Sequence, residues 1–485
     1  MSSYLFTLTI TPVQSFITQA RKTKDLFAGS KILSSIIRNT IKKAEDEYNA
    51  KLIFPQDNDH NAKRIFPQDI EFVSNKFVLK LEDKDPKVLG DDLEKFINKE
   101  SINLIFKKTN KCDTVFYNFF QVFWVAVKLT DDYKKDYKKL EHSLGAVKNL
   151  RTFTQKLQQK GKEKCSICGE RNWEEKESED KLCLICYTKR VCGRDEIDSS
   201  FQSTADIVML NRKDSLNGKI AQKYLEDNPS EKKYYALIHL DIDSLGKTLS
   251  NLDEEGQIKL SKALANFSEE AKDTVDKAGK TIYAGGDDFL GFVNLSYLFD
   301  VIIDIQKAFE ETVKKEFSNL TYSTSIIIAH YKAPLHKVLD YSRELLAQTK
   351  NHFDDKNGVG IIVMSNSAIN AQTICRYDDL PLLKEMRNKK IGMNLHYKLN
   401  SVFNFLDDTS MGYKEEYAYQ MGMLEIEIKR LLKREQIDFS FDIYRKLIDF
   451  LHQQVDGLDT ETKITIDFDN FIGYLKTLEQ LKKVM

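Results

Sequence analysis

Aspartates in two short sequences are the residues of this chain whose types and spacing best suit chemistry. The first sequence is Leu-Asp-Ile-Asp-Ser-Leu-Gly at 240–246, and the second is Gly-Gly-Asp-Asp at 285–288. Each follows a short apolar run that predicts a strand, at 235–240 and 280–284. If these strands are neighbours, four carboxylates converge at one end of a sheet: Asp241, Asp243, Asp287 and Asp288. Carboxylates packed that closely resist ionisation unless a cation neutralises them, and Mg²⁺ and Mn²⁺ prefer oxygen ligands. We therefore predict a divalent-metal site for nucleotide chemistry.

Backbone groups beside these aspartates fit a bound triphosphate. Gly285 and Gly286 let phosphates approach the backbone without meeting a Cβ atom. Ser244 and Gly246 open the next segment with backbone amides suited to phosphate. Two metal ions held roughly 3.5–4 Å apart could activate an attacking hydroxyl and stabilise a pyrophosphate leaving group. The predicted site therefore binds two Mg²⁺ or Mn²⁺ ions and a nucleoside triphosphate.

Several of these residues also fit ordinary structural roles. Gly-Gly-Asp-Asp alone is typical of a plain hairpin turn, and Asp243 fits a helix N-cap as well as a metal ligand. Lys350 ends a predicted helix, where it fits either a phosphate contact or a lysine that complements the helix dipole. We expect His239, near the end of the first strand, to be a packed core histidine.

Four cysteines predict a structural zinc site. They form two Cys-x-x-Cys pairs separated by 14 residues: Cys165, Cys168, Cys183 and Cys186. Four thiolates suit a closed tetrahedral zinc site, whereas catalytic zinc keeps an open position. The other cysteines have no paired spacing and are interpreted as plain thiols: Cys112, Cys192 and Cys375. Because the chain shows no signal peptide and no apolar run of about 18 residues, we expect a cytoplasmic protein.

The length of 485 residues is too great for one ordinary core, so several domains are expected. We predict an α+β protein. Its predicted units are a first mixed unit at 1–160, a zinc module at 161–193, a connecting helical segment at 194–232, a β-α-β-β-α-β palm domain at 233–372 and a helical bundle at 373–485. Lys and Arg total 73 against 74 Asp and Glu. Any polynucleotide contact must therefore depend on local patches or partner subunits.

Three blocks of sequence make the chain similar to a known family, the large polymerase-bearing subunits of type III CRISPR–Cas effector complexes, subtype B in particular. The N-terminal block runs from Ile-Thr-Pro-Val-Gln-Ser-Phe-Ile at 10–17 through 20–30. The second block is the set of four cysteines. The third is the palm set, which consists of 240–246, 285–288 and Ser-Ile-Ile-Ile-Ala-His-Tyr-Lys at 325–332. The palm set alone is shared with diguanylate cyclases, but those proteins normally place Glu in the turn and lack the cysteines.

The resemblance implies two ferredoxin-like, nucleotidyl cyclase-like palms that face each other, of which only the second carries the metal turn. It implies ATP as substrate, AMP transfer with loss of pyrophosphate, and a second-messenger oligoadenylate, commonly cyclic. Asp287 and Asp288 would match the family's metal-binding pair, with Asp241 as their partner. Asp25 and Ser30 of the first palm would lie near a nucleotide, although a helix-to-helix corner is an equal interpretation of 25–30.

The resemblance also implies partners: guide RNA, target RNA that switches synthesis on, and the other effector subunits in antiviral defence. Many members of the family carry an N-terminal HD nuclease. This chain has no His-Asp dipeptide, so we expect no HD nuclease activity. Two alternatives stay open. AMP could be transferred to another small acceptor such as S-adenosylmethionine, or the chain could be a catalytically silent scaffold that binds guide and target RNA.

Overall fold

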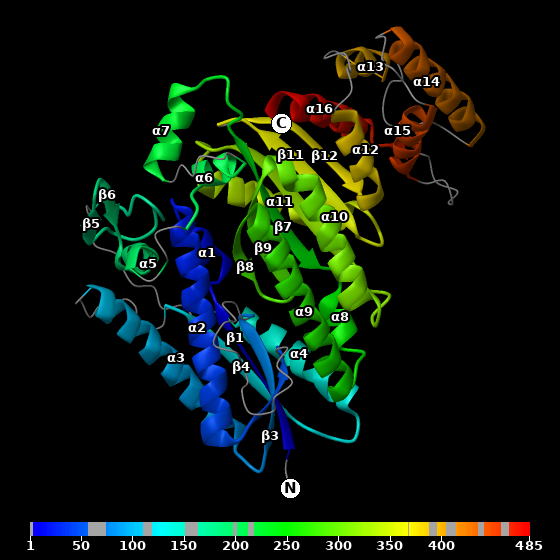
Figure 1. The fold of residues 1–485 in the computed structure, drawn as a ribbon. Helices are drawn as coiled ribbons and strands as arrows, with labels where there is room; N and C mark the ends of the chain where they lie inside the picture. The colour runs from blue at the N-terminus through cyan, green and yellow to red at the C-terminus, as the bar shows by residue number, and fades with distance from the viewer. Residues whose placement is uncertain are drawn as a thin grey trace.

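The structure is a computed structural model in which two β-sheets with covering helices lie side by side and a helical lobe projects at one end (Figure 1). It describes residues 3–56, 74–109, 119–150, 163–195, 197, 201–211, 218–366, 368–387, 395–403, 414–434, 441–456 and 465–485. Within these ranges, no helix combines the length and the apolar character needed to cross a membrane.

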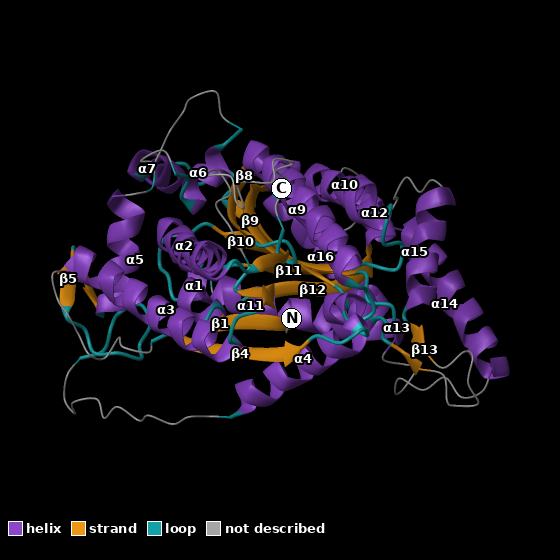
Figure 2. Cartoon of the chain, turned by 90° about the horizontal axis from the view of Figure 1, so that it is seen from below, coloured by secondary structure: helices purple, strands orange, loops and turns teal. Residues whose placement is uncertain are grey.

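The N-terminal sheet has four strands in the order β2-β3-β1-β4, and its pairs are all antiparallel. The strands are β1 (Ser3–Thr11), β2 (Lys51–Phe54), β3 (Lys76–Glu82) and β4 (Gln121–Lys128). The helices are α1 (Gln14–Thr18), α2 (Thr23–Tyr48), α3 (Pro86–Thr109) and α4 (Tyr133–Asn149). Figure 2 shows α2 and α3 on one side of β1 and β4, and α4 on the other. Omitting the short α1, the order is β-α-β-β-α-β, which is the palm arrangement. The strand β2 was not predicted from the sequence.

A small cysteine-bearing module and two short helices connect the sheets. The module consists of a hairpin, β5 (Glu175–Glu177) and β6 (Asp180–Leu182), followed by α5 (Leu184–Asp195), which packs against α2 and α3. The connecting helices are α6 (Thr204–Met209) and α7 (Lys219–Asp227).

The second sheet has six strands in the order β12-β11-β10-β7-β9-β8. They are β7 (Tyr234–Ile242), β8 (Gly279–Ala284), β9 (Asp288–Asn294), β10 (Tyr322–His330), β11 (Gly358–Met364) and β12 (Ile369–Arg376). Only β10 and β11 pair in parallel. The helices are α8 (Leu245–Leu249), α9 (Glu254–Ala278), α10 (Leu298–Phe309), which continues into a π-helical turn (Glu310–Lys314), and α11 (Leu335–His352). Because β12 runs to Arg376, the sheet extends beyond residue 372, where the sequence analysis ended this domain.

Apolar residues at helical spacing explain α9. Asp253 caps the helix by accepting a hydrogen bond from the backbone N–H of Gly256 at 2.8 Å. One apolar face of the helix is buried: Leu260, Leu264, Phe267, Ala271 and Val275. This face packs on the second sheet, so the long helix supports β8 and β9 from behind.

After β12, the residues that the structure describes are helical apart from one small hairpin. It contains α12 (Leu380–Arg387), α13 (Leu395–Phe403), α14 (Lys414–Arg434), α15 (Phe441–Gln453), the hairpin β13 (Val455–Asp456) and β14 (Thr465–Ile466), and α16 (Phe468–Val484). In Figure 1, α13, α14 and α15 form the projecting lobe, whereas α16 lies along β12. Apolar side chains at helical spacing are buried in α14 and α15: Met421, Leu424, Ile428, Leu431, Leu447, Ile448 and Leu451.

Side chains of the first palm contact α9 of the second. Glu254 lies 2.6 Å from the ammonium of Lys51 and 3.4 Å from that of Lys80. The Tyr133 hydroxyl donates a hydrogen bond to Gln257 at 2.8 Å. Gln257 is fully buried, so this polar contact lies inside the interface. The two sheets are therefore joined by polar and ionic contacts and not by apolar packing alone.

Candidate active site and zinc site

The central strand β7 ends at the predicted metal site. Asp241 pairs across the sheet with Asp288, the first residue of β9, and on its other side with Ser323 of β10. Since directly paired residues point to the same face of a sheet, the Asp241 and Asp288 side chains are neighbours. The sheet therefore brings together residues that are 47 positions apart in the sequence.

The Gly-Gly-Asp-Asp turn needs both of its glycines. The turn is closed by a hydrogen bond from the N–H of Gly285 to the carbonyl of Asp288 at 2.9 Å. Gly286 has φ +93°, a conformation that L side chains rarely adopt, and a Cβ atom on Gly285 would lie 1.9 Å from the Tyr283 hydroxyl. The carbonyl of Asp287 accepts a hydrogen bond from the N–H of Ile242 at 2.9 Å, which ties the turn to β7.

The electrostatics of this site favour a bound cation. Burial, followed by the charges of Asp288 and Asp241, raises the pKa of Asp287 to about 7. Burial also raises the pKa of Asp241, against the opposing effect of the Lys350 ammonium, which contacts its carboxylate. The Lys350 ammonium thus already lies against Asp241. Asp241 is paired with Asp288, and Asp287 is near enough for the charges of both to act on it. The residues present fit one or more divalent metal ions.

Asp243, the fourth predicted ligand, is buried with both oxygens hydrogen-bonded to protein. Its side chain is 3% exposed. It accepts hydrogen bonds from the hydroxyls of Thr321 and Ser323 at 2.9–3.0 Å and from the N–H of Asn357 at 3.2 Å. Asp243 is not the N-cap of α8, because Ser244 occupies that position and makes no side-chain capping bond. The structure thus shows Asp243 joining β7 to β10, a contact that only the strand pairing reveals.

The predicted phosphate-binding residues lie around these carboxylates. Ser244 and Gly246 are exposed next to Asp243, and no atom lies within 4 Å of a Cβ built on Gly246. Lys350 lies with its ammonium on Asp241 and 3.9 Å from an oxygen of Asp243. The structure therefore gathers the second-palm candidates at one edge of the sheet.

The two first-palm candidates do not face an open site. Asp25 is 2% exposed, and its two oxygens accept hydrogen bonds from Arg190 of α5 at 2.8 and 3.0 Å. Ser30 lies in the same helix and is fully buried. Both side chains are buried in this structure, Asp25 against Arg190 of α5, and their expected place beside a nucleotide stays a prediction. The corner interpretation is wrong, since 23–48 form one continuous helix.

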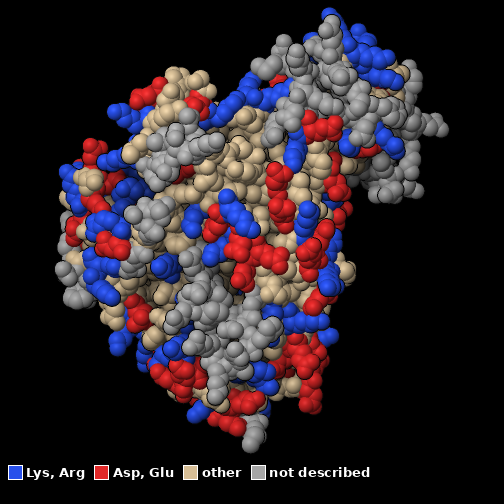
Figure 3. Space-filling view, viewed as in Figure 1, with Lys and Arg blue, Asp and Glu red and all other residues tan. Residues whose placement is uncertain are grey.

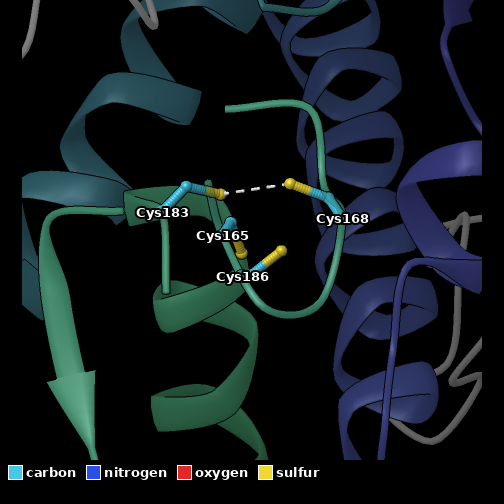
Figure 4. A group of neighbouring side chains, drawn as sticks. All are labelled: Cys165, Cys168, Cys183 and Cys186. Atoms are coloured by element: carbon cyan, nitrogen blue, oxygen red, sulfur yellow. Dashed lines mark hydrogen bonds between the residues drawn. The ribbon is translucent and has the colours of Figure 1, made fainter. Parts of the chain in front are cut away.

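The four cysteines form a compact cluster (Figure 4). Cys165 and Cys168 come from a loop, whereas Cys183 and Cys186 lie at the start of α5. Their sulfur atoms all lie within 4.8 Å of one another, and the Cys168–Cys183 separation is 3.9 Å. A tetrahedral zinc ion with Zn–S bonds of about 2.3 Å requires sulfur separations of roughly 3.8 Å. The cluster therefore fits a structural zinc ion.

The remaining cysteines show no such grouping. Cys192 and Cys375 are buried and outside the cluster, and Cys112 lies outside the described residues.

Lys189, one turn after Cys186 in α5, is 1% exposed and donates hydrogen bonds to the carbonyls of Phe16 and Gln19. The cysteine module is therefore fastened to α1 as well as to α2.

Charged side chains of both signs are interspersed over the face seen in Figure 3. The basic side chains at the upper right of this view belong to α14, whose C-terminal half carries Lys429, Arg430, Lys433 and Arg434. This distribution agrees with the near-zero net charge and leaves local patches for any contact with a polyanion.

Two protein families match the parts of the chain that carry the two sheets. The family described as Cas10/Cmr2, second palm domain, matches residues 234–360, and CRISPR-associated protein Cmr2, N-terminal, matches residues 5–108. The CRISPR system Cmr subunit Cmr2 of Pyrococcus furiosus is 25% identical over 331 residues, which cover 59% of this chain and 36% of that protein. The aligned region thus spans little more than a third of this relative.

Solved structures share the fold at low sequence identity. A type III-B Cmr-beta complex, in its apo state and bound to cognate target RNA, aligns with TM-scores of 0.67 and 0.65. In both, identity is 14% over 99% of this chain, and the match covers 82% and 83% of the other chain. A Csm1–Csm4 cassette in complex with pppApApA aligns with a TM-score of 0.54 at 11% identity, over all of this chain and 70% of the other. Residues 234–360 of this chain thus match the Cas10/Cmr2 second palm domain, residues 5–108 match the Cmr2 N-terminal domain, and the chain shares the fold of these type III CRISPR subunits.

Proposed function

We propose that this chain is a metal-dependent nucleotidyltransferase that joins AMP units from ATP within a type III CRISPR effector complex. The observation that carries the proposal is the pairing of Asp241 with Asp288 at one end of the strands, with Asp287 beside them in the turn and Lys350 against Asp241. Such a group binds divalent cations and, through them, the phosphates of a nucleotide. Its product would be an oligoadenylate second messenger, linear or cyclic.

The reaction assigned to the site is an in-line displacement at phosphorus. The 3′-hydroxyl oxygen of one nucleotide attacks the α-phosphorus of a second ATP, the bond to the pyrophosphate oxygen breaks, and the hydroxyl proton leaves to solvent. Divalent cations bound there would lower the pKa of the attacking hydroxyl and neutralise charge on the leaving group. Space for the triphosphate is proposed beside Gly286, where no atom lies within 4 Å of a Cβ position. Lys350 would exchange Asp241 for a phosphate oxygen.

The related structures support the substrate class and the partners. The Csm1–Csm4 cassette binds pppApApA, a linear adenylate, and the Cmr-beta complex binds cognate target RNA. We extend both to this chain as proposals: ATP as substrate, and guide RNA, target RNA and further effector subunits as partners. For the zinc cluster we propose a structural role, because four sulfur ligands leave no open position for a substrate.

The test is to incubate the assembled complex with labelled ATP, Mg²⁺ or Mn²⁺ and target RNA, and to determine the mass of the product. An oligoadenylate that disappears in an Asp287→Ala, Asp288→Ala variant of intact assembly supports the proposal. A product that forms only when S-adenosylmethionine is added would replace it with AMP conjugation. If no nucleotide gives a product with either metal ion, the proposed enzyme is wrong and a scaffold role remains.

A further inference from the structure

A buried histidine side chain lies within hydrogen-bond distance of one of the predicted metal ligands. His239 precedes Asp241 by two residues on β7, so the two side chains share a face of the strand. The ring is 8% exposed, and its Nε2 atom lies 3.0 Å from Oδ1 of Asp288. Because an ionised carboxylate carries no proton, the Nε2–H group must be the donor in this hydrogen bond.

The opposite edge of the same ring contacts one buried serine, Ser342, which is itself hydrogen-bonded to a second buried serine, Ser325. The Nδ1 atom lies 3.1 Å from the hydroxyl of Ser342, a residue of α11. The hydroxyl of Ser342 lies 3.1 Å from that of Ser325, which donates a hydrogen bond to the Ser342 carbonyl at 2.8 Å. Ser325 is the partner of His239 in the pairing of β7 with β10, and both serines are fully buried. The imidazole is thus fixed by three elements at once.

Asp241 and Asp288 therefore have different supports. Asp241 contacts the Lys350 ammonium, which a bound nucleotide can displace. Asp288 contacts the His239 imidazole, whose other nitrogen lies against a buried serine hydroxyl. A hydrogen bond to one oxygen of a ligating carboxylate restricts its rotation and leaves the second oxygen free for a cation.

We infer that His239 is a positioning residue that orients the Asp288 carboxylate for metal binding through its Nε2–H group. The inference rests on the proposed function, because it assumes that Asp288 binds a cation. Packing alone would not need this donor, since an apolar ring could fill the same volume. The distinguishing property of the role is its dependence on a donor at the Nε2 position.

Two amide substitutions separate the donor from the ring. In His239→Gln, the side-chain nitrogen can reach the position of Nε2, whereas in His239→Asn it reaches only that of Nδ1. Both variants lose the imidazole, so they share any packing defect. Mn²⁺ binding to the full-length, zinc-loaded chain is measured by the loss of the free-ion paramagnetic resonance signal. A variant with Asp241, Asp287 and Asp288 all changed to Asn gives the background from other sites.

We expect His239→Asn and His239→Phe to weaken Mn²⁺ binding by about 10- to 100-fold, the usual effect of losing a hydrogen bond behind a metal ligand. His239→Gln should stay near the wild-type affinity, with thermal midpoints of the Gln and Asn variants alike. Equal affinities of the Gln and Asn variants would overturn the positioning role while leaving the metal site. If the wild-type chain binds no more Mn²⁺ than the triple Asn variant, the proposed function itself fails, and the inference fails with it.

Discussion

The buried pair between Asp25 and Arg190 allows a direct test of whether α2 binds a nucleotide or the cysteine module. Arg190 is 4% exposed and donates two hydrogen bonds to Asp25, so the pair is sealed between α2 and α5. Removing one partner of a buried pair typically destabilises by about 3–5 kcal/mol. Here Arg190 keeps a second partner, Asp180, at 3.1 Å. We therefore expect Asp25→Ala to destabilise the protein by roughly 3 kcal/mol, at the lower end of that range.

A matched double variant checks the reasoning. Replacing both partners by apolar residues of similar size removes the uncompensated charge, so Asp25→Leu with Arg190→Met should recover stability to within about 1 kcal/mol of the parent. The chain has two tryptophans, Trp124 in β4 and Trp173 in the cysteine module. Denaturant unfolding followed by their fluorescence therefore reports on both sides of this contact.

The competing interpretation predicts different data. If Asp25 contacts a nucleotide, Asp25→Ala would raise the KM for ATP without changing the unfolding midpoint, and the double apolar variant would be equally defective in catalysis. That result would refute the packing role. Loss of stability in the single variant, recovery in the double variant and an unchanged KM would support it.

Three further predictions concern the charges and the zinc ion. Because the pKa of Asp287 is raised to about 7, the folded metal-free chain binds the Asp287 proton more tightly than the unfolded chain, so the free energy of unfolding falls as pH rises from about 4 to 7. Asp287→Asn should therefore be more stable than the parent at pH 8 without added divalent cations. An equal unfolding midpoint for the two proteins would count against the raised pKa. Lys350→Met should raise the KM for ATP about tenfold or more while Mn²⁺ affinity does not fall; weaker Mn²⁺ binding would show that the lysine supports the carboxylates instead. Removing zinc with a chelator should speed hydrogen exchange within 163–195 and leave the strands of the second sheet protected, whereas uniform exchange throughout would mean that zinc stabilises the whole chain.

Local sequence was enough to predict the features that depend on neighbours in the chain. The spacing of the cysteine pairs specified a four-sulfur cluster, and the glycines of 285–286 specified a tight turn before two aspartates. The apolar residues of α9 also indicate a helix, because the residues on the buried face of a helix recur every three or four positions. The short β2 was missed, since four residues before a polar segment give too little periodicity.

The roles of individual polar side chains depended on the tertiary structure. Asp243 and Asp241 look alike in sequence. In the structure, Asp243 accepts hydrogen bonds from the hydroxyls of Thr321 and Ser323, whereas Asp241 lies beside Asp288. His239 could be expected to be buried, but its contact with Asp288 required the pairing of β7 with β9.

The sequence by itself thus determined the kinds of site this protein carries, a four-cysteine cluster and an acidic edge, because both are encoded by short spacings. Only the tertiary structure decided which charged groups stay accessible and which are consumed in packing. Asp25 is one of the charged groups used in packing. Its partner Arg190 lies 165 residues away in the chain, so no local sequence pattern predicts a bond between them. The physical reason is that a buried charge must be compensated by whatever the fold brings beside it, and that neighbour is set by the packing of whole elements.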